Sequence, residues 1–307
     1  MEKCTERALR RKGHKTLVID DRRANRLIGR KLTQRWALYQ ARKFQPDCVI
    51  LSKCLGLEIE TVRTILDGKP NSMWYHDPQW YKSTYRPDIA HIAAVGKLAQ
   101  TFFVSGFEKE WRALGLNAKF LPSAADRDIK PVPPRKQFHS DVSFIGTGYD
   151  PSRAQFLLKV AKKYDLKVWG PGWEEWRKPL NWGGHSVEGK EFAAVCSSSR
   201  ISLGINPDRA KGGGAYTSDR TWMVILAGGF FLGHGTPELK QMLREGDHCA
   251  WYKDIESCLA QCAYYLENSA QRERIRREGQ VFVRQNHTFD QRIHNLLSGE
   301  EFRNPLA

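Results

Sequence analysis

The stretch ISLGINPDRAKGGGAYTSDRTWMVILAGGFFL, residues 201–232, decides how this 307-residue chain is interpreted. Its first residues, Ile201–Ile205, alternate apolar and small or polar side chains, which predicts a short buried strand. A polar loop with consecutive glycines, including Gly213 and Gly214, comes next. After a short helix pattern, a second strand is predicted over 230–232. The predicted unit is therefore a strand, a glycine loop, a helix and another strand.

The start of that helix is suited to bind phosphate. Ser218 and Asp219 are good N-cap residues for a helix over 220–227. Backbone N–H groups and the positive end of the helix dipole meet there, next to a glycine loop that lets backbone approach a ligand. Arg220 adds a fixed charge in the first turn. An ordinary glycine-rich connection between strand and helix is the alternative that these residues leave open.

Predicted strands and helices alternate along the whole chain, which is typical of an α/β fold with parallel sheets. In the first half the predicted strands cover 15–20, 47–51 and 71–75, and the predicted helices cover 30–44 and 57–66. A proline-rich connection over 131–136 is the best candidate for a domain boundary. We therefore predict two domains, 1–135 and 136–307, with the last helix crossing back to the first domain.

An aromatic segment, WYHDPQWY, follows the predicted strand over 71–75. Trp74, Trp80 and Tyr81 could stack on a sugar or a base, and His76 and Asp77 could bind its hydroxyl groups. Asp77 could also accept a hydroxyl proton. An aromatic-rich loop packed against a neighbouring helix is an equally good interpretation.

Charge is distributed unevenly along the chain. The net charge is +15, and residues 1–43 alone hold 14 Lys and Arg against four Asp and Glu. Arg22, Arg23 and Arg26 belong to this basic region. A solvated helix face explains part of it, but the surplus favours a polyanionic partner, nucleic acid first and an anionic membrane surface second.

The remaining composition narrows the class of protein. The sequence lacks a signal-like N-terminus and an apolar run long enough to cross a bilayer, so we expect a soluble, cytoplasmic protein. Seven cysteines without a C-x-x-C pair are expected to be reduced residues of the core. No metal-ligand spacing is present, and no metal is predicted.

Several motifs of the second half resemble one known family. They are SFIGTGYDPSR (143–153), WGPGW (169–173), SLGIN (202–206), SDRTW (218–222) with AGGFFL (227–232), EGDHCAWY (245–252) and NHTFDQR (286–292). In this order they resemble the glycosyltransferases of the spore-maturation CgeB type, which are GT-B enzymes related to the retaining GT-4 group. The first half resembles the family more loosely, through YHDP (75–78) and LPSAAD (121–126).

The resemblance implies two Rossmann-like domains facing each other across a cleft. It implies a nucleotide diphosphate sugar, with UDP-glucose as the first choice, in the second domain, an acceptor held by the first domain, and metal-independent, retaining transfer. The donor-binding residues that it implies are Gly146, Thr147, Arg153, Gly170, Trp173, Asn206, Gly213, Gly214, Ser218 and Arg220, with Arg220 also catalytic. The sequence departs from the family at Met223 and Ala215, where relatives carry glutamates, so the ribose contact is unassigned.

The basic first half suggests that the acceptor is DNA with a hydroxymethylated pyrimidine, as in phage DNA modification. Extrusion of the target nucleotide would then bring it against the aromatic segment, with Asp77 as the catalytic residue at its hydroxyl. Two alternatives stay open. One is a transferase acting on a cell-envelope or spore-coat glycan, and the other is a nucleic-acid-binding protein that kept the fold without the chemistry.

Overall fold

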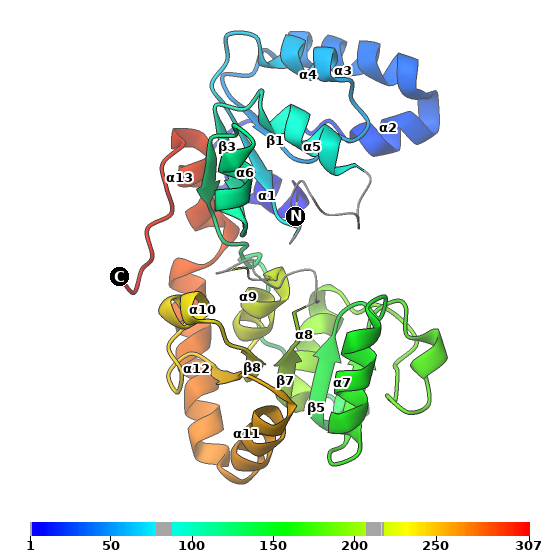
Figure 1. The fold of residues 1–307 in the computed structure, drawn as a ribbon, viewed down its shortest axis with the longest axis vertical. Coiled ribbons are helices and arrows are strands. Elements are labelled where there is room, and N and C mark those ends of the chain that lie inside the picture. The colour runs from blue at the N-terminus through cyan, green and yellow to red at the C-terminus, as the bar shows by residue number, and fades with distance from the viewer. Residues whose placement is uncertain (1, 78–87, 207–215, 217) are drawn as a thin grey trace. The chain divides into compact units, whose positions relative to one another are not determined.

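The computed structural model describes residues 2–77, 88–206, 216 and 218–307 (Figure 1). The chain forms two units, each built on one parallel sheet. Unit 1 consists of Met1–Pro122 and Phe289–Arg303, and unit 2 consists of Ser123–Thr288 and Asn304–Ala307. The change of unit after Pro122 comes before the proline-rich connection, and Pro131 packs within unit 2 beside Gly228.

Unit 1 has a four-stranded sheet in the order β1-β2-β3-β4, and all its strand pairs are parallel. Its elements are α1 (Glu2–Arg11), α2 (Asp21–Ile28), α3 (Arg30–Phe44), β1 (Val49–Leu51), α4 (Ile59–Leu66), β2 (Asn71–Tyr75), α5 (Ile89–Gly96), β3 (Thr101–Val104), α6 (Glu108–Ala113), β4 (Ala118–Phe120) and α13 (Phe289–Ser298). The predicted strands over 47–51 and 71–75 and the predicted helix over 30–44 are confirmed.

The strand predicted over 15–20 is wrong. These residues form an irregular connection from α1 to α2, in which Leu17 and Val18 are exposed and only Ile19 packs on the core. The segment ends at Asp20, whose carboxylate accepts a hydrogen bond from the Arg23 backbone N–H and caps α2. A local cap therefore competes with strand formation, and the apolar pattern alone did not reveal it.

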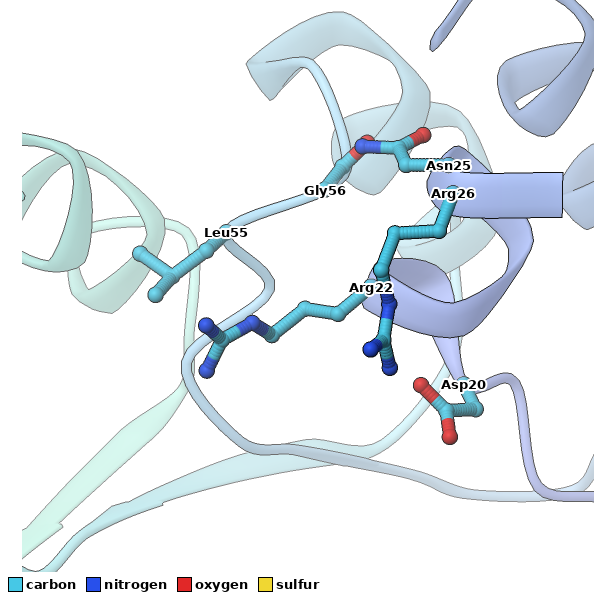
Figure 2. A pocket seen from close by; sticks show the side chains of 6 residues that line it. All are labelled: Asp20, Arg22, Asn25, Arg26, Leu55 and Gly56. Carbon is cyan, nitrogen blue, oxygen red and sulfur yellow. The ribbon is translucent and has the colours of Figure 1, made fainter. Parts of the chain in front are cut away.

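Helices α2 and α3 hold the loop that follows β1 at Gly56 (Figure 2). The Gly56 carbonyl accepts hydrogen bonds from the Asn25 and Gln34 side-chain amides, and its N–H donates to the Asp21 carboxylate at 2.6 Å. A Cβ at this position would lie 2.8 Å from the Asp21 backbone, so only glycine fits. This contact fixes α2 beside the carboxyl end of β1.

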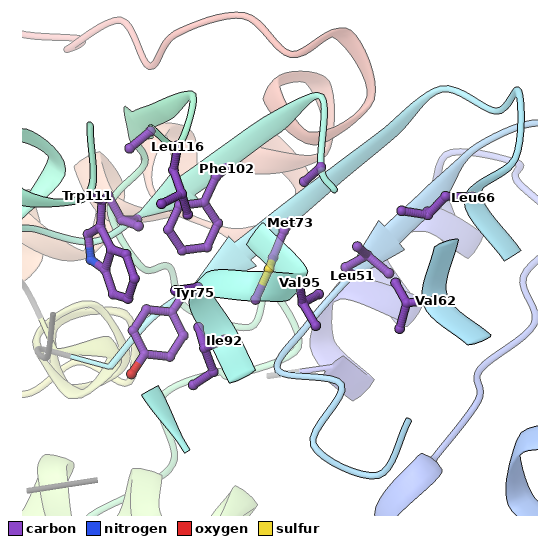
Figure 3. Packing of buried hydrophobic residues seen from close by; sticks show 14 of the residues in the cluster. Leu51, Val62, Leu66, Met73, Tyr75, Ile92, Val95, Phe102, Trp111 and Leu116 are labelled. Atoms are coloured by element: carbon purple, nitrogen blue, oxygen red, sulfur yellow. The ribbon is translucent and has the colours of Figure 1, made fainter. Parts of the chain in front are cut away.

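The core of unit 1 lies between its sheet and helices α3 to α6 (Figure 3). Tyr75, Phe102 and Trp111 make edge or stacked ring contacts with centroids 5.2–6.4 Å apart. The late helix α13 packs on the same unit, where Leu296 accepts a hydrogen bond from the buried Ser72 hydroxyl. The last helix of the chain thus completes the first unit, and about 170 residues of chain separate it from β4.

Unit 2 has a five-stranded sheet in the order β6-β5-β7-β8-β9, again with every pair parallel. Its elements are η1 (Lys136–Phe138), β5 (Ser140–Ile145), α7 (Pro151–Ala161), β6 (Leu166–Trp169), η2 (Glu174–Trp176), α8 (Gly189–Ser198), β7 (Ser199–Gly204), α9 (Asp219–Leu226), β8 (Phe231–His234), α10 (Pro237–Met242), β9 (Ala250–Tyr252), α11 (Ile255–Glu267) and α12 (Ser269–Asn286). Because the strands are parallel, all their carboxyl ends lie at one edge, where α/β folds bind ligands.

Candidate functional site

Two glycine turns pack backbone against backbone at the carboxyl edge of the unit 2 sheet. Gly146 donates to the Trp169 carbonyl at 2.8 Å, and Gly148 donates to the Pro171 carbonyl at 2.9 Å. A Cβ at Gly148 would lie 2.1 Å from the Gly172 oxygen, so a side chain there would separate the two turns. The turn after β5 therefore owes its shape to the turn after β6.

Gly170 and Trp173, two of the expected donor-binding residues, take part in this packing. A Cβ at Gly170 would lie 2.2 Å from the Gly146 oxygen, and its φ of 122° favours glycine. The Trp173 ring is fully buried with its edge toward Phe144, and its indole N–H donates to the Gly146 carbonyl at 2.8 Å. Both residues hold Gly146 in position from within the protein.

Arg153 also has a positioning role. Arg153 is 5% exposed, and its guanidinium donates to both the backbone and hydroxyl oxygens of Thr147, each at 3.1 Å. A third bond of 3.1 Å reaches the Ile205 carbonyl. Arg153 therefore ties the turn after β5 to the end of β7, where Asn206 follows, half-buried. Its helix, α7, begins with Asp150 as N-cap and Pro151 in the first turn, both favourable at a helix start.

Arg220 lies in the first turn of α9, beside the Gly146 turn. Its guanidinium carbon is 4.7 Å from the centre of the Phe144 ring, and a Cβ on Gly146 would lie 3.1 Å from that carbon. Burial lowers the pKa of Arg220, although the side chain stays a cation. Within the described part of the chain, no group accepts a hydrogen bond or forms an ion pair with this guanidinium. A partly desolvated cation of this kind is available to an anionic ligand.

The amino end of α9 adds to the same electrostatic environment. Ser218 is the N-cap, as predicted, and its hydroxyl oxygen accepts from the Arg220 N–H at 3.4 Å. The Asp219 carboxylate accepts from the same N–H at 2.9 Å. Helix N-termini favour anions. The glycines that we expected at this loop, Gly213 and Gly214, lie outside the described residues.

Two side chains at the same sheet edge were missed by the sequence analysis. Tyr252 ends β9, and its hydroxyl donates to the Gly204 carbonyl at 2.9 Å. Burial raises the pKa of Tyr252 well above its usual value, so the phenol keeps its proton. His234 ends β8, with its ring centre 5.9 Å from that of Tyr252. The sequence could have indicated both residues, because His234 and Tyr252 lie at the ends of predicted strands, where α/β folds bind ligands.

In unit 1, Asp77 follows β2 and forms an ion pair with Lys53, whose Nζ lies 2.8 Å from the Asp77 Oδ2. Lys53 follows β1, so the pair joins the carboxyl ends of two neighbouring parallel strands. The sequence analysis did not predict Lys53, because contact between residues 24 positions apart depends on the sheet. The carboxylate is 28% exposed and remains accessible.

The aromatic segment around Asp77 differs from the expected stacking surface. Trp74 is 3% exposed and donates its indole N–H to the Leu121 carbonyl, with His76 and Phe289 against its ring. Trp74 is therefore a core residue. Burial lowers the pKa of His76 to about 3, so its imidazole is neutral at ordinary pH. The other two expected aromatic residues, Trp80 and Tyr81, lie outside the described residues.

The expected cationic residues Arg22, Arg23 and Arg26 are exposed on α2, and Arg22 and Arg26 line a surface pocket together with Gly56. In the described ranges, no cluster of three or more His, Cys, Asp or Glu side chains has the geometry of a metal site. None of the described helices is long and apolar enough to span a membrane.

Comparison with known proteins shows what the second half of the chain and the fold as a whole are similar to. Residues 153–298 match the family described as glycosyl transferase-like. No curated protein matches the sequence significantly. The fold is similar to that of HepE from Anabaena in complex with UDP-glucose, with a TM-score of 0.64 and 11% identity over 87% of this chain and 82% of that chain.

Two further solved structures have the same architecture. Sucrose-phosphate synthase from Thermosynechococcus elongatus has a TM-score of 0.60 and 10% identity over 87% of this chain and 78% of that one. A UDP-N-acetylglucosamine 2-epimerase homologue from Listeria monocytogenes has a TM-score of 0.50 and 11% identity over 94% and 84%. The fold is thus shared by proteins with different reactions.

The fold, with its two parallel sheets, is therefore the GT-B fold of glycosyltransferases. The match to the glycosyl transferase-like family covers α9 and most of unit 2, so this part of the chain is similar to that family.

Proposed function

We propose that this protein transfers a hexosyl group from a nucleotide diphosphate sugar, UDP-glucose as the first choice, to a hydroxyl group of an acceptor. The observation that supports the donor assignment most is the Arg220 guanidinium, a partly desolvated cation without an acceptor among the described residues. It adjoins Gly146 and the start of α9, so a cation, backbone N–H groups and a helix dipole meet at one place.

This arrangement suits the chemistry of glycosyl transfer. The bond between the anomeric carbon and the diphosphate oxygen breaks, and a new bond forms from that carbon to the acceptor oxygen, whose proton is released. Negative charge develops on the departing diphosphate. Arg220 and the amino end of α9 would stabilise that charge, and a preorganised cation in a partly desolvated setting does so effectively. We therefore propose a metal-independent reaction, and the resemblance to the GT-4 group implies retention of configuration.

Asp77 is our proposal for the residue that orients the acceptor hydroxyl. Its carboxylate is accessible and held by Lys53 at the carboxyl edge of the unit 1 sheet. A carboxylate fixed in this way can accept a hydrogen bond from a hydroxyl group. The prediction of a hydroxymethyl-pyrimidine acceptor in DNA rests on the basic first half, and the same assay tests it.

The experiment measures transfer and donor hydrolysis with radiolabelled UDP-glucose, with and without a chelator. Candidate acceptors are glycans, lipid-linked acceptors, and duplexes with plain or hydroxymethylated pyrimidines. We expect R220A to lower both rates about a hundredfold, the usual loss for one charge-stabilising contact. D77N should lower transfer but keep hydrolysis, because it acts on the acceptor only. The control is R200A, since Arg200 is exposed and pairs with Asp141 far from the glycine turns.

Near-normal turnover of R220A would place the donor elsewhere, and loss of activity in the chelator would remove the metal-independent mechanism. Normal transfer by D77N would remove the role of Asp77. An epimerised nucleotide sugar, formed without transfer, would replace the proposed reaction by that of another protein with this fold.

A further inference from the structure

Helices α2 and α3 carry an unusual combination of exposed side chains. They lie side by side in unit 1, and α4 packs against α3 (Figure 1). Residues 22–46 contain eight Lys and Arg and no Asp or Glu. All eight cations are exposed: Arg22, Arg23, Arg26, Arg30, Lys31, Arg35, Arg42 and Lys43. We call the outward side of the two helices the basic apolar face.

Large apolar side chains are exposed between these cations. Leu27 is 72% exposed, Leu32 54% and Tyr39 60%, and Ile28 and Phe44 are exposed to a lesser extent. Of the ten exposed large hydrophobic residues in the described part of the chain, seven lie within residues 17–44. Such clustering marks an interaction surface, whereas single exposed apolar residues are ordinary.

The residues on the inward side of α3 show that its exposed apolar side chains are not merely the rim of the unit 1 core. The fully buried residues of α3 are small or polar, namely Thr33, Gln34, Ala37 and Ala41, and its large apolar residues Trp36 and Leu38 pack on the core only partly buried. The larger Leu32 and Tyr39 share the outward side with Arg35 and Lys43, at spacings of three and four residues. A helix that packs only on its own core keeps its large apolar residues on the inner side, whereas Leu32 and Tyr39 of α3 are more than half exposed. The outward apolar residues therefore suit a second apolar environment.

A pocket of about 620 Å³ opens beside this face (Figure 2). Arg22 and Arg26 extend from α2 over the pocket, and Leu55 and Gly56 form the opposite wall. The hydrogen bonds at Gly56 fix this wall to α2 and α3. Two arginines at one cavity can pair with a phosphate group.

We propose that the basic apolar face docks on an anionic lipid bilayer. Leu27, Leu32 and Tyr39 would enter the boundary between headgroups and acyl chains, while the surrounding cations would pair with lipid phosphates. Nucleic acid would use the cations equally well, but exposed Leu and Ile side chains gain little on a phosphodiester backbone. The exposed aliphatic side chains of this face therefore favour a lipid partner over a nucleic acid.

The test is co-sedimentation of the full chain with vesicles of phosphatidylcholine alone or mixed with phosphatidylglycerol. We expect binding to the anionic vesicles that weakens with salt. The double variant L27S/L32S should lose at least about tenfold in affinity, because two aliphatic side chains no longer leave water. Its control is V281S, since Val281 is 54% exposed on α12 of unit 2.

A second double variant with its own control separates the contribution of charge to vesicle binding from that of apolar contact. R35Q/K43Q should weaken vesicle binding by about thirtyfold, at roughly 1 kcal/mol for each of the two cations near an anionic surface. Its control, K162Q/K163Q, changes two exposed lysines of unit 2 and should bind as the wild type does. None of these four variants alters a residue assigned to the donor or acceptor. Donor hydrolysis in solution should therefore stay unchanged and reports on the proposed function separately.

Failure of the wild type to bind anionic vesicles would overturn the proposal. So would unchanged vesicle binding by L27S/L32S, because the face would then be purely electrostatic. If a DNA duplex binds as tightly as the vesicles and only R35Q/K43Q releases it, the face is a nucleic-acid surface instead.

Discussion

At the scale of single residues, the donor and acceptor assignments depend on how each charged group is held. Arg153 and Arg220 are both arginines near the turn after β5, but the first is engaged by Thr147 and Ile205. The second lies on the Phe144 ring without a described acceptor. We therefore assign Arg153 to positioning and Arg220 to the ligand. Their sequence contexts do not distinguish them, because the difference is one of tertiary partners.

His76 gives a prediction about pH. Burial lowers its folded-state pKa from 6.5 to about 3. Between these values the unfolded chain binds a proton that the folded chain excludes, so stability falls as pH is lowered from 6.5 towards 3. One such group contributes up to about 1.4 kcal/mol per pH unit to the free energy of unfolding. Denaturant unfolding of H76Q across this range should show a shallower slope than the wild type.

The control for this measurement is H14Q, because His14 is exposed. Its slope should match that of the wild type. The slope is compared, not the absolute stability, so a general destabilisation by the His76 substitution does not affect the conclusion. An equal slope in H76Q and the wild type would show that His76 is protonated in the folded chain.

At the scale of elements, the proposed donor site contains two turns whose close contact leaves room only for glycine. Gly146 and Gly148 contact Gly170 and Gly172 at distances that leave no room for a Cβ. These turns follow neighbouring strands, β5 and β6, whose register brings Ile145 opposite Trp169. The glycines of the turn after β5 are required for its close contact with the second turn.

G148A tests this interpretation. Its Cβ would meet the Gly172 oxygen at 2.1 Å, so the turns must separate. We expect a loss of about 1–3 kcal/mol in stability, as for other overpacked sites. UDP affinity should also fall, because the Gly146 turn moves. Thermal unfolding and calorimetric titration with UDP measure the two effects.

The control is G246A, at a glycine with φ of 80° and nothing within 4 Å of its Cβ position. That variant carries backbone strain without crowding, so stability should fall while UDP affinity is unchanged. Full UDP affinity in G148A would mean that the turn after β5 does not contact the donor.

At the scale of the whole molecule, the two units carry different charge and different proposed partners. Most of the net charge of +15 lies in the first half, where α2 and α3 form the basic apolar face. The second half matches the glycosyl transferase-like family and carries the Arg220 site. Because all the proposed donor-binding residues lie in unit 2, we expect donor binding to stabilise the backbone of unit 2 only.

Hydrogen exchange with and without UDP checks that division. We expect slower exchange at the backbone amides of 145–150 and 218–222 when UDP is bound, because ligand binding suppresses local opening. Exchange in α2 and α3 should stay the same. R220A should lose the protection at an equal UDP concentration. Protection confined to unit 1 would contradict the donor assignment.

The sequence by itself determined the parallel sheets, the unit around residues 201–232 and the order of elements, except for the strand over 15–20 and helix α2, which was not predicted. Those features depend on local periodicity, caps and glycines, which a linear pattern contains. It also placed Ser218 and Arg220 at the start of α9, because an N-cap is a local signal. The one wrong strand, 15–20, failed where the Asp20 cap of α2 competed with an apolar run.

Only the tertiary structure decided what each side chain contacts. It buried Trp74 and Trp173, brought Lys53 to Asp77, and left Arg220 beside Gly146 without a described acceptor. It also placed Leu27 and Leu32 outward among cations, whereas helical periodicity alone does not say which side meets a core. The physical reason is the same in each case: burial and pairing depend on residues far apart in sequence, which meet only when the sheets and helices pack.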